Sequence, residues 1–162
     1  YGVFFESNID APPFKVIKKV SGIDIRQYEK MIWVSHTMSS ENQSFRHLFR
    51  YIDGHNNENQ KIPMTAPVIE NNGDMMFVMP STMANAPTPS NKDLQVKSMK
   101  TLKVAVLSFR GSANGAQKHR EKLRNKLEKE NIQTTGEWYL CQYNSPWVFP
   151  LFRKNEIWVE VN

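Results

Sequence analysis

The sequence has a single cysteine, Cys141, and no long apolar run. One cysteine excludes an intramolecular disulfide and a zinc site built from several cysteines. No stretch comes near the roughly 18 apolar residues that a membrane-spanning helix requires. The sequence also lacks a glycine-rich phosphate loop, the His-Glu-x-x-His pattern and the Gly-x-Ser-x-Gly pattern. These absences argue against the common enzyme classes, and we expect a protein that is not an enzyme.

The rest of the composition is typical of a folded, moderately basic protein. The chain has 162 residues and a formal net charge of +5. This length predicts one domain over residues 1–162, with residues 1–13 as a surface arm. The densest basic run, residues 118–129, is interrupted by Glu121 and Glu128, which favours a solvated helix face over a nucleic-acid-binding surface. A mildly positive surface also suits an anionic ligand.

Most of the chain has the alternation and the β-branched and aromatic residues that are typical of strands. Ser21-Gly22 supplies a two-residue hairpin turn, and residues 71–74 supply another turn. Cys141 lies in one of these strand-like segments, where a small core residue is expected. The predicted strands span residues 14–20, 23–28, 31–38, 68–70, 75–79, 94–98, 102–109, 137–143 and 156–161.

A first helix is predicted over residues 41–53. Ser40 and Gln43 have the spacing of a capping box. Gly54 is a suitable C-terminal stop. Apolar residues recur between these ends with the helical period: Phe45, Leu48, Phe49 and Ile52.

A second helix is predicted over residues 116–130, with Asn114 as its candidate cap. Leu123 and Leu127 form its apolar stripe, with Ala116 and either His119 or Arg120 one turn or more earlier. Because this stripe is thin, we expect the helix to pack on one side only.

The two halves of the chain share an order of strand, helix, strand, strand, which predicts a duplicated unit with little residue identity. Two such units predict an α+β fold, in which a curved antiparallel sheet or barrel carries two helices. A sheet and a pair of helices of this kind can enclose a cleft.

The most distinctive stretch is KIPMTAPV over residues 61–68, which follows YIDGHN over residues 51–56. Pro63 and Pro67 cannot sit inside a helix or a central strand. The stretch therefore predicts an extended segment that leads from a helix into a strand. The pairing of Tyr-Ile-x-Gly-x-Asn with this stretch resembles the SOUL heme-binding protein family.

Two further motifs, in the expected order, extend the resemblance over nearly the whole chain. IRQY at residues 25–28 is followed by WVS at residues 33–35, and QYNSP at residues 142–146 is followed by RKNEIWV at residues 153–159. The resemblance implies a distorted antiparallel β-barrel flanked by two α-helices. It also implies heme or another tetrapyrrole as the ligand, held in a shallow apolar groove between the first helix and the loop before the last strand.

On the first helix, the resemblance places apolar contacts at Phe45 and Phe49 and a basic residue at Arg50. Asn42 stands where one relative has arginine, and Arg46 is a candidate to replace it. The same apolar stripe is also what a core-facing helix would show. Leu48 and Ile52 are expected to point inward, with Phe45 and Phe49 on the groove flank.

The loop before the last strand contains large apolar residues, although loops normally face water. They would cover a flat macrocycle by stacking, or tuck over one end of the barrel. The cofactor-binding candidates in this loop are Trp147, Val148, Phe149 and Phe152.

Iron ligation is not specified by the sequence. The resemblance points to no ligand here, because Gln27 stands where some relatives carry histidine. His36 and His47 are candidate ligands, although each is expected to be a surface or satisfied histidine, and helical geometry directs His47 away from Phe45 and Phe49. Without an axial ligand, binding would rest on apolar contact and arginine–propionate pairs, and metal-free porphyrins would bind as well.

Five carboxylates lie in or beside the predicted strands. Glu70 and Asp74 flank a turn and are expected to be solvated. Glu137, Glu156 and Glu160 could point into the barrel, but we expect them to face solvent or to pair with Arg153 and Lys154.

The sequence thus predicts a tetrapyrrole-binding protein for transport, buffering or delivery of heme or porphyrin. Two other interpretations stay open: a protein-interaction module with incidental heme binding, and a tetrapyrrole-modifying enzyme. No nucleic-acid partner is expected, and a protein partner stays open. The Tyr1 start and the glycosylation triplet at residues 42–44 favour a secreted mature chain over a cytoplasmic one.

Overall fold

The computed structural model describes residues 9–144 and 153–162 of the chain. The strands and helices follow one another in the order that the sequence predicts, and their ends differ from the predicted ones by a few residues at most. The elements are β1 (Phe14–Val20), β2 (Ile23–Tyr28), β3 (Met31–Thr37), α1 (Glu41–Ile52), β4 (Val68–Asn71), β5 (Asp74–Val78), β6 (Leu94–Met99), β7 (Leu102–Arg110), α2 (Ala116–Lys129), β8 (Thr134–Gln142) and β9 (Lys154–Val161).

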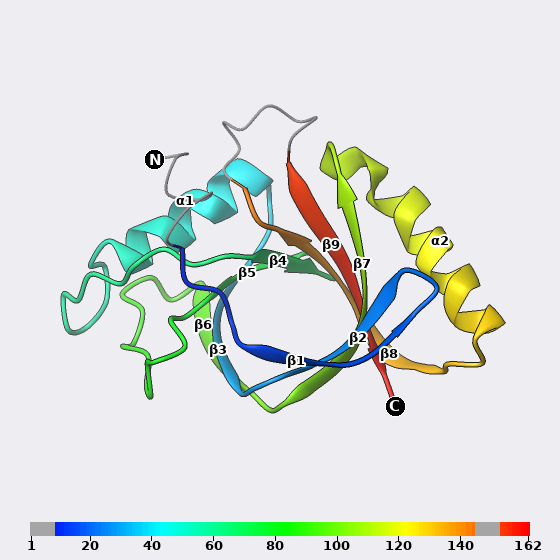
Figure 1. Cartoon of the computed structure of the whole chain (residues 1–162). Helices are drawn as coiled ribbons and strands as arrows, with labels where there is room; N and C mark the ends of the chain where they lie inside the picture. The colour runs from blue at the N-terminus through cyan, green and yellow to red at the C-terminus, as the bar shows by residue number, and fades with distance from the viewer. Residues whose placement is uncertain (1–8, 145–152) are drawn as a thin grey trace.

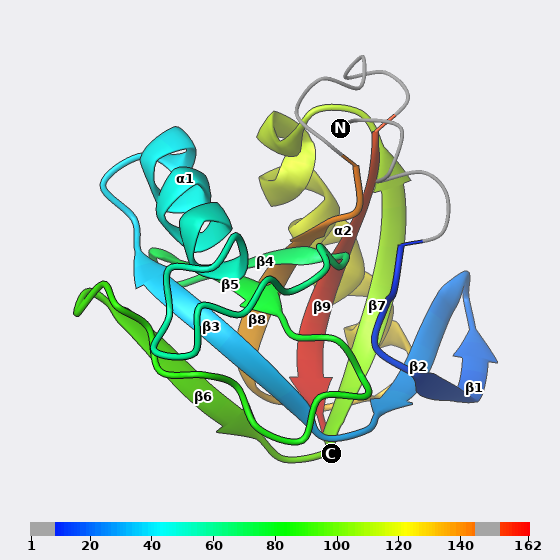
Figure 2. The ribbon, with the colours of Figure 1, turned by 90° about the vertical axis from the view of Figure 1, so that its left-hand side faces the viewer.

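The strands form one antiparallel sheet in the order β1-β2-β7-β9-β8-β4-β5-β3-β6. The sheet curls into a half-barrel, and the two helices lie against its outer face (Figures 1 and 2). The predicted α+β fold, a distorted barrel flanked by two helices, is therefore confirmed. The order β3-α1-β4-β5 is repeated by β7-α2-β8-β9, as the duplicated pattern predicts. No helix within the described ranges is long and apolar enough to cross a membrane.

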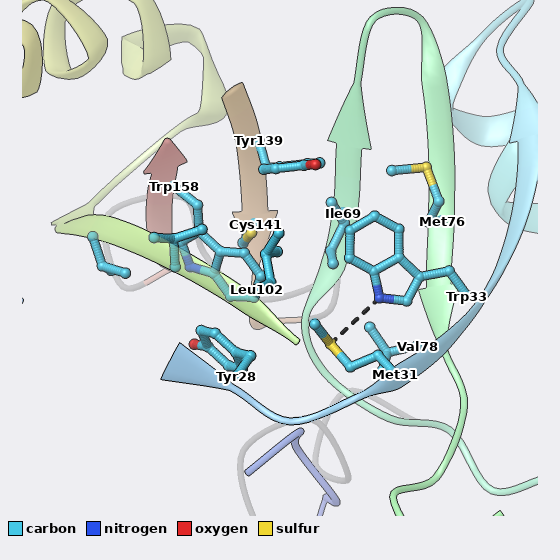
Figure 3. Close-up of a cluster of buried hydrophobic side chains, with 12 residues drawn as sticks. Tyr28, Met31, Trp33, Ile69, Met76, Val78, Leu102, Tyr139, Cys141 and Trp158 are labelled. Atoms are coloured by element: carbon cyan, nitrogen blue, oxygen red, sulfur yellow. Dashed lines mark hydrogen bonds between the residues drawn. The ribbon is translucent and has the colours of Figure 1, made fainter. Parts of the chain in front are cut away.

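The inner face of the half-barrel carries an aromatic and sulfur-rich core (Figure 3). Trp158 is fully buried and contacts the rings of Tyr28 and Tyr139, with centroids 4.4 and 6.4 Å away. Cys141 is fully buried in the same cluster, as expected for a small core residue. Burial of the thiol raises its pKa, so it stays protonated and unreactive near neutral pH.

Each helix packs its own core against the outer face. α1 buries Leu48, Tyr51 and Ile52 against residues of β3, β4 and β5. α2 buries only Leu123 and Leu127, against residues of β2, β7 and β9. The thin stripe of α2 therefore packs on one side only, as predicted.

The helix ends show one confirmed prediction and one wrong one. The Ser40 side chain caps α1 by accepting from the backbone N–H of Gln43 at 3.2 Å. Asn114 does not cap α2, because Ala113–Gly115 form a 3₁₀ turn before the helix. Ser112 caps this turn instead, and α2 begins after Gly115 without a side-chain cap.

The segment between α1 and β4 is extended, as its two prolines require. The backbone N–H of Ile62 donates to the carbonyl of Ile52 at 2.7 Å, which holds the segment against the end of α1. The Thr65 hydroxyl donates to the carbonyl of Val78. The backbone N–H of Ala66 donates to the carbonyl of Asp10 at 3.0 Å, so this segment also fastens the first described residues to the sheet.

Candidate ligand-binding site

The two helices leave a trough between them on the outer face of the sheet. α1 contacts β3 and β5, whereas α2 contacts β7 and β9, so β4 and β8 lie between the helices (Figure 1). Neighbouring strands lie about 4.8 Å apart, so two strands keep the helices apart, and the outward side chains there are only partly covered. We call these two strands, with the helix flanks beside them, the interhelical trough. Its floor is made of four half-buried side chains: Glu70, Trp138, Leu140 and Gln142.

Side-chain alternation decides which residues reach this floor. Tyr139 and Cys141 belong to the inner core, so Leu140 between them points to the outer face, where it packs beside the α2 core. Ile69 likewise belongs to the inner core. Glu70 therefore points outward, and it lies opposite Leu140 in the pairing of β4 with β8.

α1 turns an aromatic flank toward the trough. Phe45 and Phe49 are half-buried, and their rings stack with centroids 6.4 Å apart and planes at 12°. Phe45 also contacts Phe77 of β5, the neighbour of β4, with centroids 5.2 Å apart. Glu41, one turn earlier on the same flank, acts electrostatically on Glu70 of β4. These contacts place the flank of Phe45 and Phe49 beside the trough.

On the α2 side, the trough contains a pocket of about 250 Å³. The pocket lies between the β4–β5 turn, the middle of β8 and the first turns of α2. Its walls include Met38, Glu70, Asn72, Ala116, Arg120 and Leu140. Asn71 steadies the turn, because its side-chain amide donates to the carbonyl of Trp138 at 2.7 Å.

Glu70 is the acidic group of the floor. Gln142 Nε2 donates to Glu70 Oε2 at 2.6 Å. Burial of the carboxyl group, and then the charge of Glu41, raise the pKa of Glu70 to about 7, although the hydrogen bond from Gln142 opposes the rise. The prediction of a solvated Glu70 is therefore wrong. It rested on the nearby turn, whereas the pairing of β8 with β4 takes the carboxyl group partly out of water.

The raised pKa predicts that Glu70 makes stability depend on pH. Between about pH 4.5 and pH 7 the folded protein holds a proton on Glu70 that the unfolded chain has lost, so the free energy of unfolding falls as the pH rises through this window. Glu70→Gln keeps the acceptor for Gln142 but cannot ionise. We expect it to stabilise the protein at pH 8 by about 1–2 kcal/mol, and to have little effect at pH 4.5.

Urea denaturation of both proteins at pH 4.5 and pH 8 measures this difference. Glu128→Gln, at an exposed position of α2, is the matched control and should leave the pH dependence of the wild type in place. An equal effect of Glu70→Gln at both pH values would contradict the assignment.

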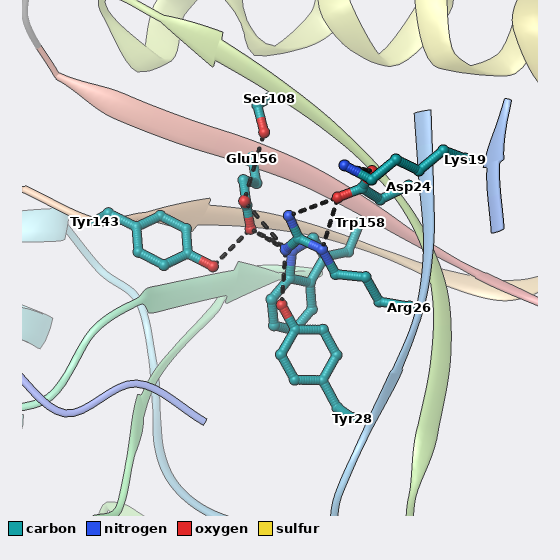
Figure 4. A network of polar contacts seen from close by, with 8 residues as sticks. All are labelled: Lys19, Asp24, Arg26, Tyr28, Ser108, Tyr143, Glu156 and Trp158. Carbon is teal, nitrogen blue, oxygen red and sulfur yellow. Dashed lines mark hydrogen bonds and ion pairs between the residues drawn. The ribbon is translucent and has the colours of Figure 1, made fainter. Parts of the chain in front are cut away.

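Another carboxylate, Glu156, is fully buried on the inner face (Figure 4). Its oxygens accept from Tyr143 Oη at 2.6 Å, Trp158 Nε1 at 2.9 Å and Arg26 Nη1 at 3.2 Å. Burial disfavours the charge of Arg26, but Glu156 and the neighbouring tyrosines outweigh it, so the pKa of Arg26 is raised. Asp24 also pairs with Arg26, at 3.2 Å.

The expectation that Glu156 faces solvent or pairs with Arg153 or Lys154 is wrong, since its partner comes from β2. Glu160 accepts from Tyr139 Oη at 2.7 Å, whereas Glu137 is exposed as expected. Because the network satisfies Glu156 within the protein, the inner face offers a ligand no free carboxylate there. The trough on the outer face is the better candidate site.

The family model of the SOUL heme-binding protein matches residues 9–160. This chain belongs to the SOUL family. Heme-binding protein 2 of Homo sapiens is 31% identical to this SOUL protein, over 84% of this chain and 76% of the relative. Heme-binding protein 1 of Xenopus laevis is 27% identical, over 82% of this chain and 80% of the relative.

Solved structures show the same fold at much lower identity. The C-terminal domain of EcmrR superposes with a TM-score of 0.68 and 11% identity, covering 86% of the SOUL chain and 96% of that domain. An uncharacterized conserved protein from Listeria innocua has a TM-score of 0.58 and 10% identity, and the superposition covers 98% of the SOUL chain and 95% of that protein. At such identities the likeness concerns the fold alone.

The residues that the resemblance assigned to the SOUL groove occupy different places. Phe45 and Phe49 flank the trough, as described above. Arg46 and Arg50 are exposed on the side of α1 that faces away from the sheet, and Asn42 is exposed in its first turn. The loop candidates lie outside the described residues, so their role stays a prediction: Trp147, Val148, Phe149 and Phe152.

The two candidate iron ligands lie together on the other flank of α1. His36 is buried on β3, its Nδ1 lies 2.7 Å from Ser44 Oγ, and its ring lies 4.8 Å from that of His47. Burial, and then His47, lower the pKa of His36. His47 lies away from Phe45 and Phe49, as helical geometry predicts. Within residues 9–144 and 153–162, no cluster of three or more histidine, cysteine, aspartate or glutamate side chains could hold a metal ion.

The trough also contains residues that sequence reasoning did not assign to the site, among them Arg120, Trp138 and Gln142. Arg120 lies in a run of mixed charge, which is typical of a solvated helix face. Trp138 and Gln142 lie in a predicted strand without a site motif. The alternation of β8 around the buried Cys141 would have shown that Trp138 and Gln142 share a face. Only the packing of α2 brings Arg120 to that face.

Proposed function

We propose that this SOUL protein binds heme or another tetrapyrrole without transforming it, for transport, buffering or delivery. Membership of the heme-binding family supports the ligand class. The observation that carries the proposal is the pair of stacked, half-buried rings of Phe45 and Phe49 beside the trough. A flat macrocycle can bury apolar surface against such rings and against the half-buried floor of the trough.

The chemistry of the trough suits a tetrapyrrole held by apolar contact. The trough residues named above include no histidine and no cysteine, and Met38 is the one soft side chain among them. Since apolar contact carries the binding, we expect hemin and metal-free protoporphyrin IX to bind with similar affinity. Bound heme would supply its iron for redox or ligand chemistry, while the protein supplies apolar cover and orientation. The large apolar residues of the loop before β9 belong to the proposal as a prediction from the sequence.

A titration with hemin and with protoporphyrin IX, followed by the Soret band, tests the proposal. We expect saturation near one equivalent with both ligands. Phe45→Ala combined with Phe49→Ala should weaken binding of both by about tenfold or more, since each ring contributes apolar area and stacking. Phe14→Ala is the matched control, because Phe14 is an exposed ring on β1 at the far edge of the sheet.

The other outcomes are equally informative. Saturation with hemin alone would indicate an axial ligand and would redirect attention to His36 and His47. No saturable change with either ligand would contradict the proposal and favour a protein-interaction module. Bound heme that is converted to product on incubation with a reductant would favour the enzyme instead.

A further inference from the structure

Arg120, in the second turn of α2, is half-buried but lacks the ionic partner that such a guanidinium group normally has. Its Nε atom is buried and has no hydrogen-bond partner, a condition shared by no other side-chain nitrogen or oxygen in the described part of the chain. No carboxylate of residues 9–144 and 153–162 forms an ion pair with it. Its guanidinium group lies over the ring of Trp138, 4.8 Å from the centroid. The protein thus leaves the guanidinium charge without a carboxylate, and Arg120 lines the pocket, so its N–H groups that face the pocket can take an acceptor from a ligand.

Arg124, one turn further along α2, is a useful comparison. Its guanidinium group lies over the same Trp138 ring at 5.2 Å, but it is paired with Glu121. Arg120 lines the pocket, whereas Arg124 does not belong to its walls. The two arginines therefore share a helix and an aromatic contact, and they differ in whether the protein itself satisfies them.

We propose that the pocket beside α2 holds a carboxylate of the bound ligand, with Arg120 as its anchor. This proposal rests on the tetrapyrrole function above, because the propionate side chains of a porphyrin in the trough would supply the carboxylate. The planar guanidinium group presents its N–H groups in a fork that matches two carboxylate oxygens. A pocket of about 250 Å³ has room for a propionate side chain but not for a macrocycle.

The charged groups around the pocket set the conditions of the test. Glu70 lines the pocket from β4, Glu41 acts on Glu70 from α1, and Glu137 of β8 accepts from the side-chain amides of Asn71 and Asn72. Because the pKa of Glu70 is about 7, its carboxyl group is mostly neutral at pH 6 and does not repel an incoming carboxylate. Binding is therefore measured at pH 6.

The experiment compares protoporphyrin IX with its dimethyl ester, which keeps the macrocycle but has no carboxylate. Equilibrium affinities are measured for the wild type, Arg120→Gln and Arg124→Gln. We expect Arg120→Gln to weaken binding of the acid by about tenfold or more and to leave binding of the ester unchanged. Arg124→Gln, the matched control, should change neither. The affinity of Arg120→Lys for the acid should lie between those of the wild type and Arg120→Gln, because lysine keeps the charge but loses the forked N–H groups.

A second arm uses glutarate, a carboxylate without a macrocycle, and follows the Nε–H signal of Arg120 by NMR in the wild-type protein. A shift of this signal with glutarate, together with equal wild-type affinity for acid and ester, would assign the pocket to a separate small carboxylate. Equal weakening of acid and ester by Arg120→Gln would overturn the proposal, as would unchanged acid binding with no glutarate shift. Wild-type protein that binds neither porphyrin would contradict the proposed function, and the glutarate arm would still test the pocket.

Discussion

Replacing Glu156 by leucine is expected to lower the free energy of unfolding by about 3–5 kcal/mol. The Glu156 side chain is 1% exposed, and its loss leaves Tyr143 Oη and Trp158 Nε1 without this acceptor. Arg26 Nη1 then retains only the Tyr28 hydroxyl, at 3.0 Å, as an acceptor. The cost arises mainly from the uncompensated charge of Arg26, which is 8% exposed and retains only Asp24 as an ionic partner. Urea denaturation at pH 7 measures the loss.

Two further variants separate this ionic effect from a simple loss of volume. Arg26→Met combined with Glu156→Leu should cost less than the sum of the two single changes, because no buried charge is left unpaired. Glu160→Leu, on the same face of β9, should cost only about 1 kcal/mol, since Glu160 is half-buried and accepts one hydrogen bond, from Tyr139. Strict additivity of the first pair would show that the ion pair is not what the substitution disrupts.

Leu123→Ala is expected to lower the free energy of unfolding by about 2–5 kcal/mol and to loosen α2 selectively. Leu123 is 0% exposed, and α2 has only one other buried residue, Leu127. The substitution therefore removes one of the two buried side chains that hold this helix on the sheet. Amide hydrogen exchange should become faster in α2 than in the strands beneath it, because α2 can open before the rest of the molecule unfolds.

Leu48→Ala in α1 is the informative comparison, since Leu48 is also 0% exposed. α1 retains further attachments, among them the hydrogen bond from Tyr51 Oη to the carbonyl of Pro87 at 2.6 Å. We expect a similar loss of stability for Leu48→Ala, but no selective exchange in α1. Lys122→Ala, at an exposed position of α2, should change stability by less than about 0.5 kcal/mol. Equal protection of both helices in Leu123→Ala would contradict the idea that α2 is the looser wall.

The looser attachment of α2 bears on the proposed site, because the trough has one firm wall and one weaker wall. α1 supplies Phe45 and Phe49, and α2 supplies Arg120. If a ligand carboxylate pairs with Arg120, binding should also reduce exchange in α2. The same exchange experiment with and without protoporphyrin IX can therefore detect both the weaker attachment of α2 to the sheet and its contact with the ligand.

The sequence predicts those features that depend on neighbouring residues. The apolar stripe of α1 predicts this helix: Phe45, Leu48, Phe49 and Ile52. Ser40 caps the helix, as its spacing from Gln43 suggests. The turn residues also behave as expected: Asn72 and Gly73 take positive φ values of 48° and 84°, which suits the tight β4–β5 turn. The Asn114 prediction failed because a 3₁₀ turn intervenes, and side-chain chemistry alone does not distinguish the two caps.

By itself, then, the sequence determined the order of strands and helices, the α+β class, the family and the aromatic flank of α1. Periodicity, turn chemistry and short motifs are local, and they can be read within a few residues. Tertiary structure alone decided the pairing of Glu156 with Arg26, 130 positions apart, the half-burial of Glu70 beside β8, and the unpartnered guanidinium group of Arg120 over Trp138. Charge and hydrogen bonding at these groups depend on how much water the surrounding strands and helices remove, and that is set only when distant segments pack together.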